Sequence, residues 1–208
     1  MIFLKRPALQ QYSNPACPVQ LLQGDWEFRQ LLRTVSALRP LRVLEIGSLF
    51  GGTLWHWLQL MQPFGFLMSI DHVVPPDDPR YDEQVAGHRG CWQAWGAERH
   101  ITVRVWDALS HDPAIVGDVV DHFPEGIDFL FIDGGHDYQT VYHDFTTYGA
   151  LVRSGGVIAL HDILPASDWP EIEVPRLWRE IQQSGHITQE LYSDSEQNLW
   201  GIGVVYKR

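Results

Sequence analysis

Four aspartates follow apolar stretches that have the composition of buried parallel strands. They are Asp71, Asp107, Asp133 and Asp162. In an open α/β sheet the carboxyl ends of the strands form the ligand crevice, so these carboxylates are expected to line one edge of the sheet. A single aspartate after a strand is an ordinary turn former or helix cap, but four successive ones favour a site.

The densest group of reactive side chains lies in the segment FLFIDGGHDYQTVY. Its Asp133, together with Asp162 after the next predicted strand, offers oxygen ligands that Mg²⁺, Ca²⁺ or Mn²⁺ would accept, and His161 could add a nitrogen ligand. A cation with an open position would lower the pKa of a substrate hydroxyl, and neutral His136 could then take its proton. The alternative is that His136 and Asp137 only cap the following helix.

The segment LRVLEIGSLFGGT predicts a tight turn from a buried strand into a helix. Its glycines, Gly47, Gly51 and Gly52, allow positive φ and close backbone approach, so a nucleotide-type cofactor could lie against bare backbone. The G-x-G-x-x-G fingerprint of dinucleotide binding is absent, so no glycine pattern indicates a bound pyrophosphate. A turn without any ligand is the alternative.

The rest of the chain alternates between predicted strands and helices. A helix over residues 25–38, with one apolar face, leads into this alternation. Strand-helix repetition of this kind predicts a doubly wound α/β fold around a parallel sheet. The predicted strands cover residues 41–46, 66–70, 100–106, 127–132 and 156–160, and the predicted helices include 83–95, 113–122 and 138–151.

Composition predicts one globular domain, in which residues 1–38 form an N-terminal segment with its leading helix and residues 39–208 form the main domain. The net charge of −11 disfavours a nucleic-acid partner. No apolar run approaches the roughly 20 residues that span a bilayer, and the first residues lack the pattern of a signal peptide. We therefore expect a cytoplasmic protein with no membrane partner, whose two cysteines are reduced.

With these motifs in place, the sequence resembles the class I S-adenosylmethionine-dependent methyltransferases, in the branch of the cephalosporin-hydroxylase-like and macrolide sugar O-methyltransferase enzymes. The resemblance covers about residues 39–207 and rests on LEIGSLFGGT, SIDHV, FLFIDGGHDYQTVYHDF and LVRSGGVIALHDI. It implies a Rossmann-like, mostly parallel seven-stranded sheet, with LWGIGVVYKR as an antiparallel C-terminal strand at the sheet edge. It also implies methyl transfer to a hydroxyl group of a small molecule such as a sugar or polyketide.

The resemblance implies roles for single positions. Asp71 would accept hydrogen bonds from the ribose hydroxyls of S-adenosylmethionine. Asp133 and Asp162 would bind Mg²⁺ beside the base His136, with His161 as a further ligand where some relatives have an acidic residue. The implied cofactor-binding residues are Glu45, Gly47, Ser48, Gly51, Asp71, His72, Asp107 and Asp133.

Two other functions are compatible with the same residues. A nicotinamide-dependent oxidoreductase could share the fold, although the glycine spacing disfavours it. A non-catalytic cofactor-binding protein could keep the acidic residues and His136 in structural roles. A nitrogen acceptor is also open, although no N-P-P-Y or D-P-P-Y tetrapeptide indicates one. Residues 1–23 could pack on a second copy, so a homo-oligomer is a further expectation.

Overall fold

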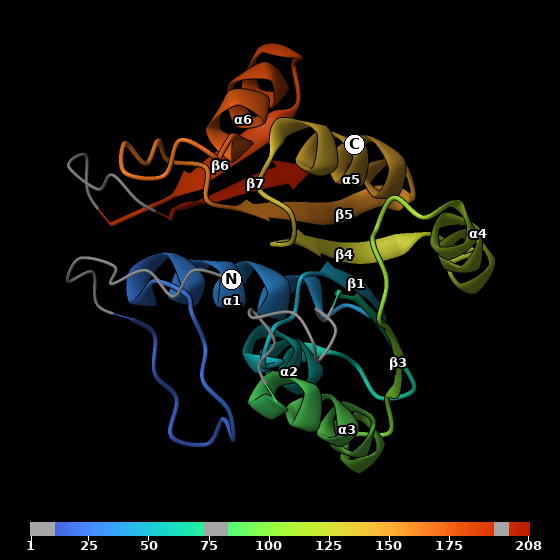
Figure 1. The fold of residues 1–208 in the computed structure, drawn as a ribbon. Helices are drawn as coiled ribbons and strands as arrows, with labels where there is room; N and C mark the ends of the chain where they lie inside the picture. The colour runs from blue at the N-terminus through green and yellow to red at the C-terminus, as the bar shows by residue number, and fades with distance from the viewer. Residues whose placement is uncertain (1–10, 73–82, 194–199) are drawn as a thin grey trace.

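The computed structural model of the protein describes residues 11–72, 83–193 and 200–208. Within these ranges, seven strands form one sheet in the order β3-β2-β1-β4-β5-β7-β6, and β7 runs antiparallel to both of its neighbours (Figure 1). The strands are β1 (Arg42–Ile46), β2 (Phe66–Ile70), β3 (Thr102–Trp106), β4 (Ile127–Ile132), β5 (Val152–His161), β6 (Ile187–Leu191) and β7 (Ile202–Tyr206), and the helices are α1 (Asp25–Leu38), α2 (Gly52–Leu60), α3 (Glu83–Glu98), α4 (Pro113–His122), α5 (Tyr138–Ala150) and α6 (Val174–Gln183).

Helices cover both faces of the sheet, and each face has its own apolar core. α1, α2 and α3 lie on one face, over a core that includes Phe28 and Trp57, whereas α4, α5 and α6 cover the other, with Tyr148 and Trp178. All six residues of the central strand β4 are buried, as expected for a strand covered on both sides. None of the described helices is both long and apolar enough to cross a membrane. The predicted doubly wound α/β fold is confirmed.

Most predicted elements agree with the structure, but the C-terminal edge of the sheet does not. β7 pairs with both β5 and β6, so it lies inside the sheet, and β6 forms the edge. β6 was not predicted, because its residues, ITQEL, are mostly exposed and include no apolar run. Leu41, predicted to be buried, precedes β1 and is 38% exposed.

Residues 11–24 pack against their own chain. The backbone N–H of Tyr12 donates to the carbonyl oxygen of Gln23 at 2.8 Å, and a β-bridge joins Gln11 to Gly24. The Tyr12 ring packs edge to face on Phe28 of α1. Self-association through the N-terminal segment stays a prediction, and residues 1–10 of that segment lie outside the described residues.

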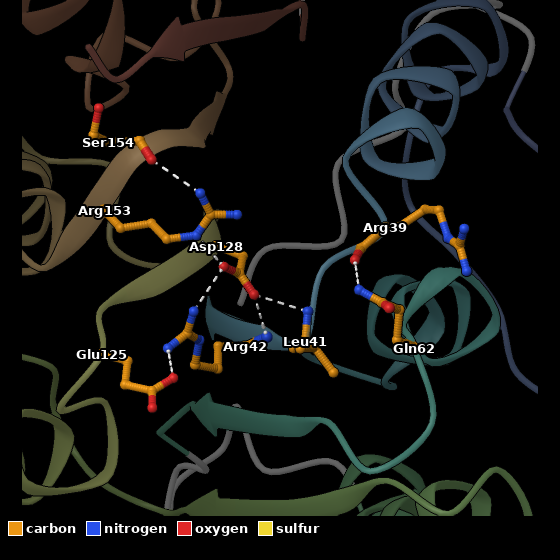
Figure 2. Close-up of polar contacts among 8 residues, drawn as sticks. All are labelled: Arg39, Leu41, Arg42, Gln62, Glu125, Asp128, Arg153 and Ser154. Carbon is orange, nitrogen blue, oxygen red and sulfur yellow. Dashed lines mark hydrogen bonds and ion pairs between the residues drawn. The ribbon is translucent and has the colours of Figure 1, made fainter.

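A buried carboxylate links three strands at the end of the sheet opposite to the strand-end aspartates. Asp128, the second residue of β4, is 2% exposed. Its Oδ2 accepts hydrogen bonds from the backbone N–H groups of Leu41 and Arg42, both at 2.8 Å, and the guanidinium groups of Arg42 and Arg153 contact its Oδ1 (Figure 2). Asp128 therefore joins the starts of β1, β4 and β5.

Asp128→Ala is expected to lower the free energy of unfolding by about 3 kcal/mol, because it leaves two arginines and two backbone N–H donors without their buried acceptor. Urea unfolding followed by circular dichroism measures this change. The matched control is Glu125→Ala, whose carboxylate also bonds Arg42 but is 83% exposed, and it should cost less than about 1 kcal/mol. Equal losses in the two variants would contradict the role of Asp128.

Candidate active site

The four strand-end aspartates form two groups, one on each side of β1. Asp71 and Asp107 follow β2 and β3, which lie on one side of β1 in the sheet, and Asp133 and Asp162 follow β4 and β5 on the other side. These five strands are parallel, so all four aspartates follow strand ends at the same edge, as predicted. The turn after β1 lies between the two groups.

This turn contacts both groups through its backbone. On one side, the N–H of Leu49 donates to Asp71 Oδ2 at 3.0 Å. On the other side, Gly47 has a φ of 85°, and a Cβ at this position would lie 2.1 Å from the carbonyl oxygen of Asp133. The backbone of Asp133 therefore requires glycine at position 47, whether or not a ligand binds there.

The next two glycines are also required by the packing of the protein itself. Gly51 has a φ of 82°, and a Cβ there would lie 2.3 Å from Nε1 of Trp92. Gly52 begins α2 without a positive φ, and a Cβ there would lie 2.7 Å from the carbonyl oxygen of Gln20. Trp92 is fully buried in the core. These close approaches are made by protein atoms.

Glu45 and Ser48 stabilise the turn after β1 through hydrogen bonds inside the protein. The Glu45 carboxylate is fully buried and accepts hydrogen bonds from the Ser48 hydroxyl at 2.6 Å and from Nε1 of Trp57 at 2.9 Å. The Ser48 hydroxyl also lies 2.8 Å from that of Ser69 on β2. Burial raises the pKa of Glu45 to about 7, and its hydrogen bonds oppose this shift. Both side chains thus hold the loop in place from inside the protein.

Arg89 of α3 joins the first aspartate group, and sequence reasoning missed it. Its Nη2 lies 2.7 Å from Asp71 Oδ2 and donates to the carbonyl oxygen of Asp71 at 3.0 Å. Its Nη1 lies 3.8 Å from Asp107 Oδ1, and Nδ1 of His72 lies 3.5 Å from the same oxygen. Burial raises the pKa of Asp71, and the guanidinium group of Arg89 works against this rise. Arg89 therefore fixes the Asp71 carboxylate.

The second group combines two carboxylates with two histidines. Nε2 of His136 lies 3.3 Å from Asp162 Oδ2 and 3.7 Å from Asp133 Oδ1. Nδ1 of His161 lies 3.3 Å from Asp133 Oδ1 and 3.3 Å from Asp162 Oδ1. These contacts have ion-pair distances without hydrogen-bond alignment, so both ring nitrogens of His161, Nε2 of His136 and both oxygens of Asp162 are buried without a hydrogen-bond partner. Polar atoms in this state indicate a place for a polar ligand.

The two histidines are charged more readily than usual because they face these carboxylates. Burial alone would lower the pKa of His161, but Asp133 and Asp162 outweigh it and raise the value to about 10. The pKa of His136 also lies above its ordinary value, because the same carboxylates again overcome burial. In return, the histidines overcome burial and hold the pKa of Asp133 and of Asp162 below their usual range.

The side chain that caps α5 belongs to Asp137, the residue next to His136. Asp137 is the N-cap of α5, and its Oδ1 accepts a hydrogen bond from the N–H of Thr140 at 3.0 Å. The His136 ring instead lies against Asp133 and Asp162. Capping therefore accounts for Asp137 and leaves the His136 side chain available to the site.

Asp133, His136 and Asp162 could hold a metal ion. Each offers one ligand atom, and these atoms all lie within 4.8 Å of one another. His161 contacts the same carboxylates, but its ring must lose a proton before it can coordinate a cation, because an imidazolium has no free lone pair. The prediction that His161 is a ligand stays a prediction.

The loop that holds Asp107 is anchored to α5. The hydroxyl of Tyr148 donates to the carbonyl oxygen of Ser110, and the fully buried Asp144 lies on the same helix as Tyr148. Burial raises the pKa of Asp144 to about 6, and the hydroxyl of Ser110 offsets part of this effect. Below about pH 6, the Asp144 carboxyl therefore keeps its proton in the folded protein.

Asp144→Asn is expected to gain stability relative to the wild type as the pH rises from about 4 to about 7. In this range the folded protein keeps a proton on Asp144 that the unfolded chain, with a pKa of about 3.9, has lost, so wild-type stability falls as pH rises. The difference should reach up to about 3 kcal/mol above pH 7. Urea unfolding at pH 4 and pH 7.5, with the exposed Asp121→Asn as control, measures it; a difference independent of pH would contradict the buried proton.

The chain is similar to known proteins over the part that holds this site. Residues 44–163 match the family model described as a methyltransferase domain, a span that includes the turn after β1 and all four aspartates. The uncharacterized protein R132 of Acanthamoeba polyphaga mimivirus is 49% identical over 123 residues, which make up 59% of this chain and 51% of that protein. The chain therefore spans about half the length of this curated relative.

Solved structures of methyltransferases share the fold. An O-methyltransferase from Bacillus cereus in complex with SAH has a TM-score of 0.60 at 18% identity, over 93% of this chain and 84% of that one. TomG from Streptomyces achromogenes, an O-methyltransferase in complex with SAM, has a TM-score of 0.57 at 17% identity, over 93% and 82%. A precorrin-6y C5,15-methyltransferase from Geobacter metallireducens has a TM-score of 0.58 at 16% identity, over 96% and 95%.

Proposed function

Since the chain belongs to the methyltransferase-domain family, we propose that it transfers the methyl group of S-adenosylmethionine to a hydroxyl group of a small molecule. The observation that carries this proposal is the pair of carboxylate groups on either side of the turn after β1. One group suits the ribose of a nucleoside, and the other, with its two histidines, suits proton removal from an acceptor. The O-methyltransferases among the similar structures support the choice of a hydroxyl acceptor.

The first group would bind the cofactor. Asp71 accepts from the N–H of Leu49 and pairs with Arg89 through Oδ2, so its carboxylate is already oriented when a ribose hydroxyl arrives. Glu45 and Ser48 would act through the turn that they brace, because their hydrogen bonds are made within the protein. We place Gly47, Gly51, His72 and Asp107 along the same cofactor, as the family resemblance implies.

The second group would activate the acceptor. When bound, S-adenosylmethionine supplies an electrophilic methyl group; the acceptor oxygen forms the new bond to carbon as the bond from carbon to sulfur breaks. His136 would take the hydroxyl proton on Nε2, and Asp133 and Asp162 would stabilise the imidazolium that results. Positioning of the two reactants would supply much of the rate.

Mg²⁺ is a further part of the proposal. Asp133 and Asp162 supply the hard oxygen ligands that this ion prefers, and the unpartnered oxygens of Asp162 fit it. A bound ion would lower the pKa of the acceptor hydroxyl. The buried positive charge of His161 already compensates part of the negative charge here, so the metal needs its own test. His136 cannot be a ligand through Nε2 and the base through the same atom.

The test is methyl transfer from S-adenosylmethionine with a labelled methyl group to a panel of sugar, polyketide and phenolic hydroxyl compounds, with amines as a parallel panel. Labelled product from the hydroxyl panel is expected. Transfer to amines alone would contradict the hydroxyl acceptor. Activity that EDTA removes and Mg²⁺ restores would support the metal, whereas activity unaffected by EDTA would remove the metal and keep the methyl transfer.

The two alternative functions predict different results in binding and turnover experiments. A nicotinamide-dependent oxidoreductase would bind NAD, and a non-catalytic cofactor-binding protein would bind S-adenosylmethionine without turnover on either panel. The cytoplasmic location and the homo-oligomer stay predictions from the sequence.

A further inference from the structure

Gln23, which precedes α1, places its side chain in the second aspartate group. It lies outside the span that matches the family model, and 110 positions separate it from Asp133 in the sequence. Its Nε2 nevertheless donates a hydrogen bond to Asp133 Oδ2 at 2.7 Å. The residue is 3% exposed, so this contact is made inside the protein.

The backbone on both sides of Gln23 is fixed. Its carbonyl oxygen accepts the hydrogen bond from the N–H of Tyr12, and its neighbour Gly24 forms the bridge with Gln11. Three residues earlier, the carbonyl oxygen of Gln20 lies against Gly52 at the start of α2. The segment therefore lies along the turn after β1, and the Gln23 side chain is held at the site.

One end of the Gln23 carboxamide has no partner. The NH₂ group must face Asp133, because only this end of the carboxamide can donate to a carboxylate. The other end, Oε1, is buried without a hydrogen-bond partner. A buried acceptor in this state costs free energy unless a ligand donates to it. Since the adjacent side chain is the Asp133 carboxylate, a positively charged donor suits this place best.

The proposed function indicates which donor this is. If Asp71 binds the ribose on the β2 side of the turn, the amino-acid end of the cofactor can extend past the turn toward β4. Gly47 contacts the backbone of Asp133 at that end of the turn. The amino-acid end of S-adenosylmethionine carries an ammonium group, which is a charged donor.

We infer that Oε1 of Gln23 accepts a hydrogen bond from the ammonium group of S-adenosylmethionine, so that the N-terminal segment supplies a cofactor-binding residue that the methyltransferase span lacks. This inference rests on the proposed function. In this arrangement Gln23 bridges the cofactor and Asp133, and it couples the occupied cofactor site to the carboxylate that faces His136.

Calorimetry with two ligands tests this contact. S-adenosylhomocysteine carries the amino-acid end, and 5′-methylthioadenosine lacks it. Gln23→Met, which keeps the size of the side chain without its polar atoms, is expected to weaken S-adenosylhomocysteine binding by about 10- to 100-fold, as for the loss of a hydrogen bond to a charged group. Binding of 5′-methylthioadenosine should change less than about twofold. Gln20→Met, at an exposed position of the same segment, is the matched control and should match the wild type with both ligands.

The other outcomes distinguish failure of the Gln23 contact from failure of the proposed function. Equal weakening of both ligands, or no weakening of either, would overturn the role of Gln23 and leave the proposed function intact. A wild-type protein that binds neither ligand would overturn the proposed function, and the Gln23 contact with it. If thermal melting shows that Gln23→Met does not fold, Gln23→Asn, which shortens the side chain and withdraws Oε1, is expected to show the same selective loss.

Discussion

Asp71→Ala is expected to weaken the binding of S-adenosylhomocysteine by about 100-fold or more. The carboxylate would make charge-assisted hydrogen bonds to the ribose hydroxyls, and each such bond contributes on the order of 1.5–3 kcal/mol. The substitution also removes the carboxylate that Arg89 contacts at 2.7 Å in the proposed cofactor site. Isothermal titration calorimetry measures the change.

Two controls separate lost binding from lost folding in this variant. Asp71→Asn keeps the shape of the side chain and should retain the native melting transition while still weakening the ligand. Asp121→Ala, a matched substitution at an exposed position of α4, should bind as the wild type does. Wild-type affinity in both Asp71 variants would contradict the assignment of the ribose to Asp71.

The second large effect concerns His136. His136→Gln is expected to lower kcat for methyl transfer by about 10²- to 10⁴-fold, the usual contribution of a general base, with little change in the KM for S-adenosylmethionine. The reason is geometric, since its Nε2 faces both Asp162 and Asp133 while Asp137 provides the helix cap. The assay is labelled methyl transfer to the acceptor found in the hydroxyl panel.

His186→Gln is the control, because this histidine is exposed just before β6. It should leave kcat unchanged. If His136→Gln keeps full kcat, the base is another group; if it loses activity together with Mg²⁺ affinity, His136 is a metal ligand. Direct titration of Mg²⁺ into both variants distinguishes these results.

The sequence predicted the elements that depend on local pattern. β4 has five apolar residues and Asp128 before Asp133, and its bounds agree with the prediction, as do those of α4 with its proline near the start. β6 was missed because an exposed edge strand has neither an apolar run nor alternation. For the same reason the place of β7 inside the sheet was not foreseen.

The strand-end aspartates were found because their position follows from the fold rule for open α/β sheets. Gln23 and Arg89 were not found, because their roles arise from contacts between distant elements and their own segments carry no motif. The glycines of the turn were predicted from the close approach of a ligand, but atoms of the protein itself also require them. Gly47 makes room for the backbone of Asp133 after β4, and Gly51 makes room for Trp92, which no spacing within the turn reveals.

The most direct test is calorimetric titration of the wild-type protein with S-adenosylhomocysteine, with NAD as the control ligand. We expect one site per chain with affinity on the order of micromolar and no heat of binding with NAD. Absence of S-adenosylhomocysteine binding, or binding of NAD in its place, would contradict the methyltransferase function and leave the α/β fold without its proposed cofactor.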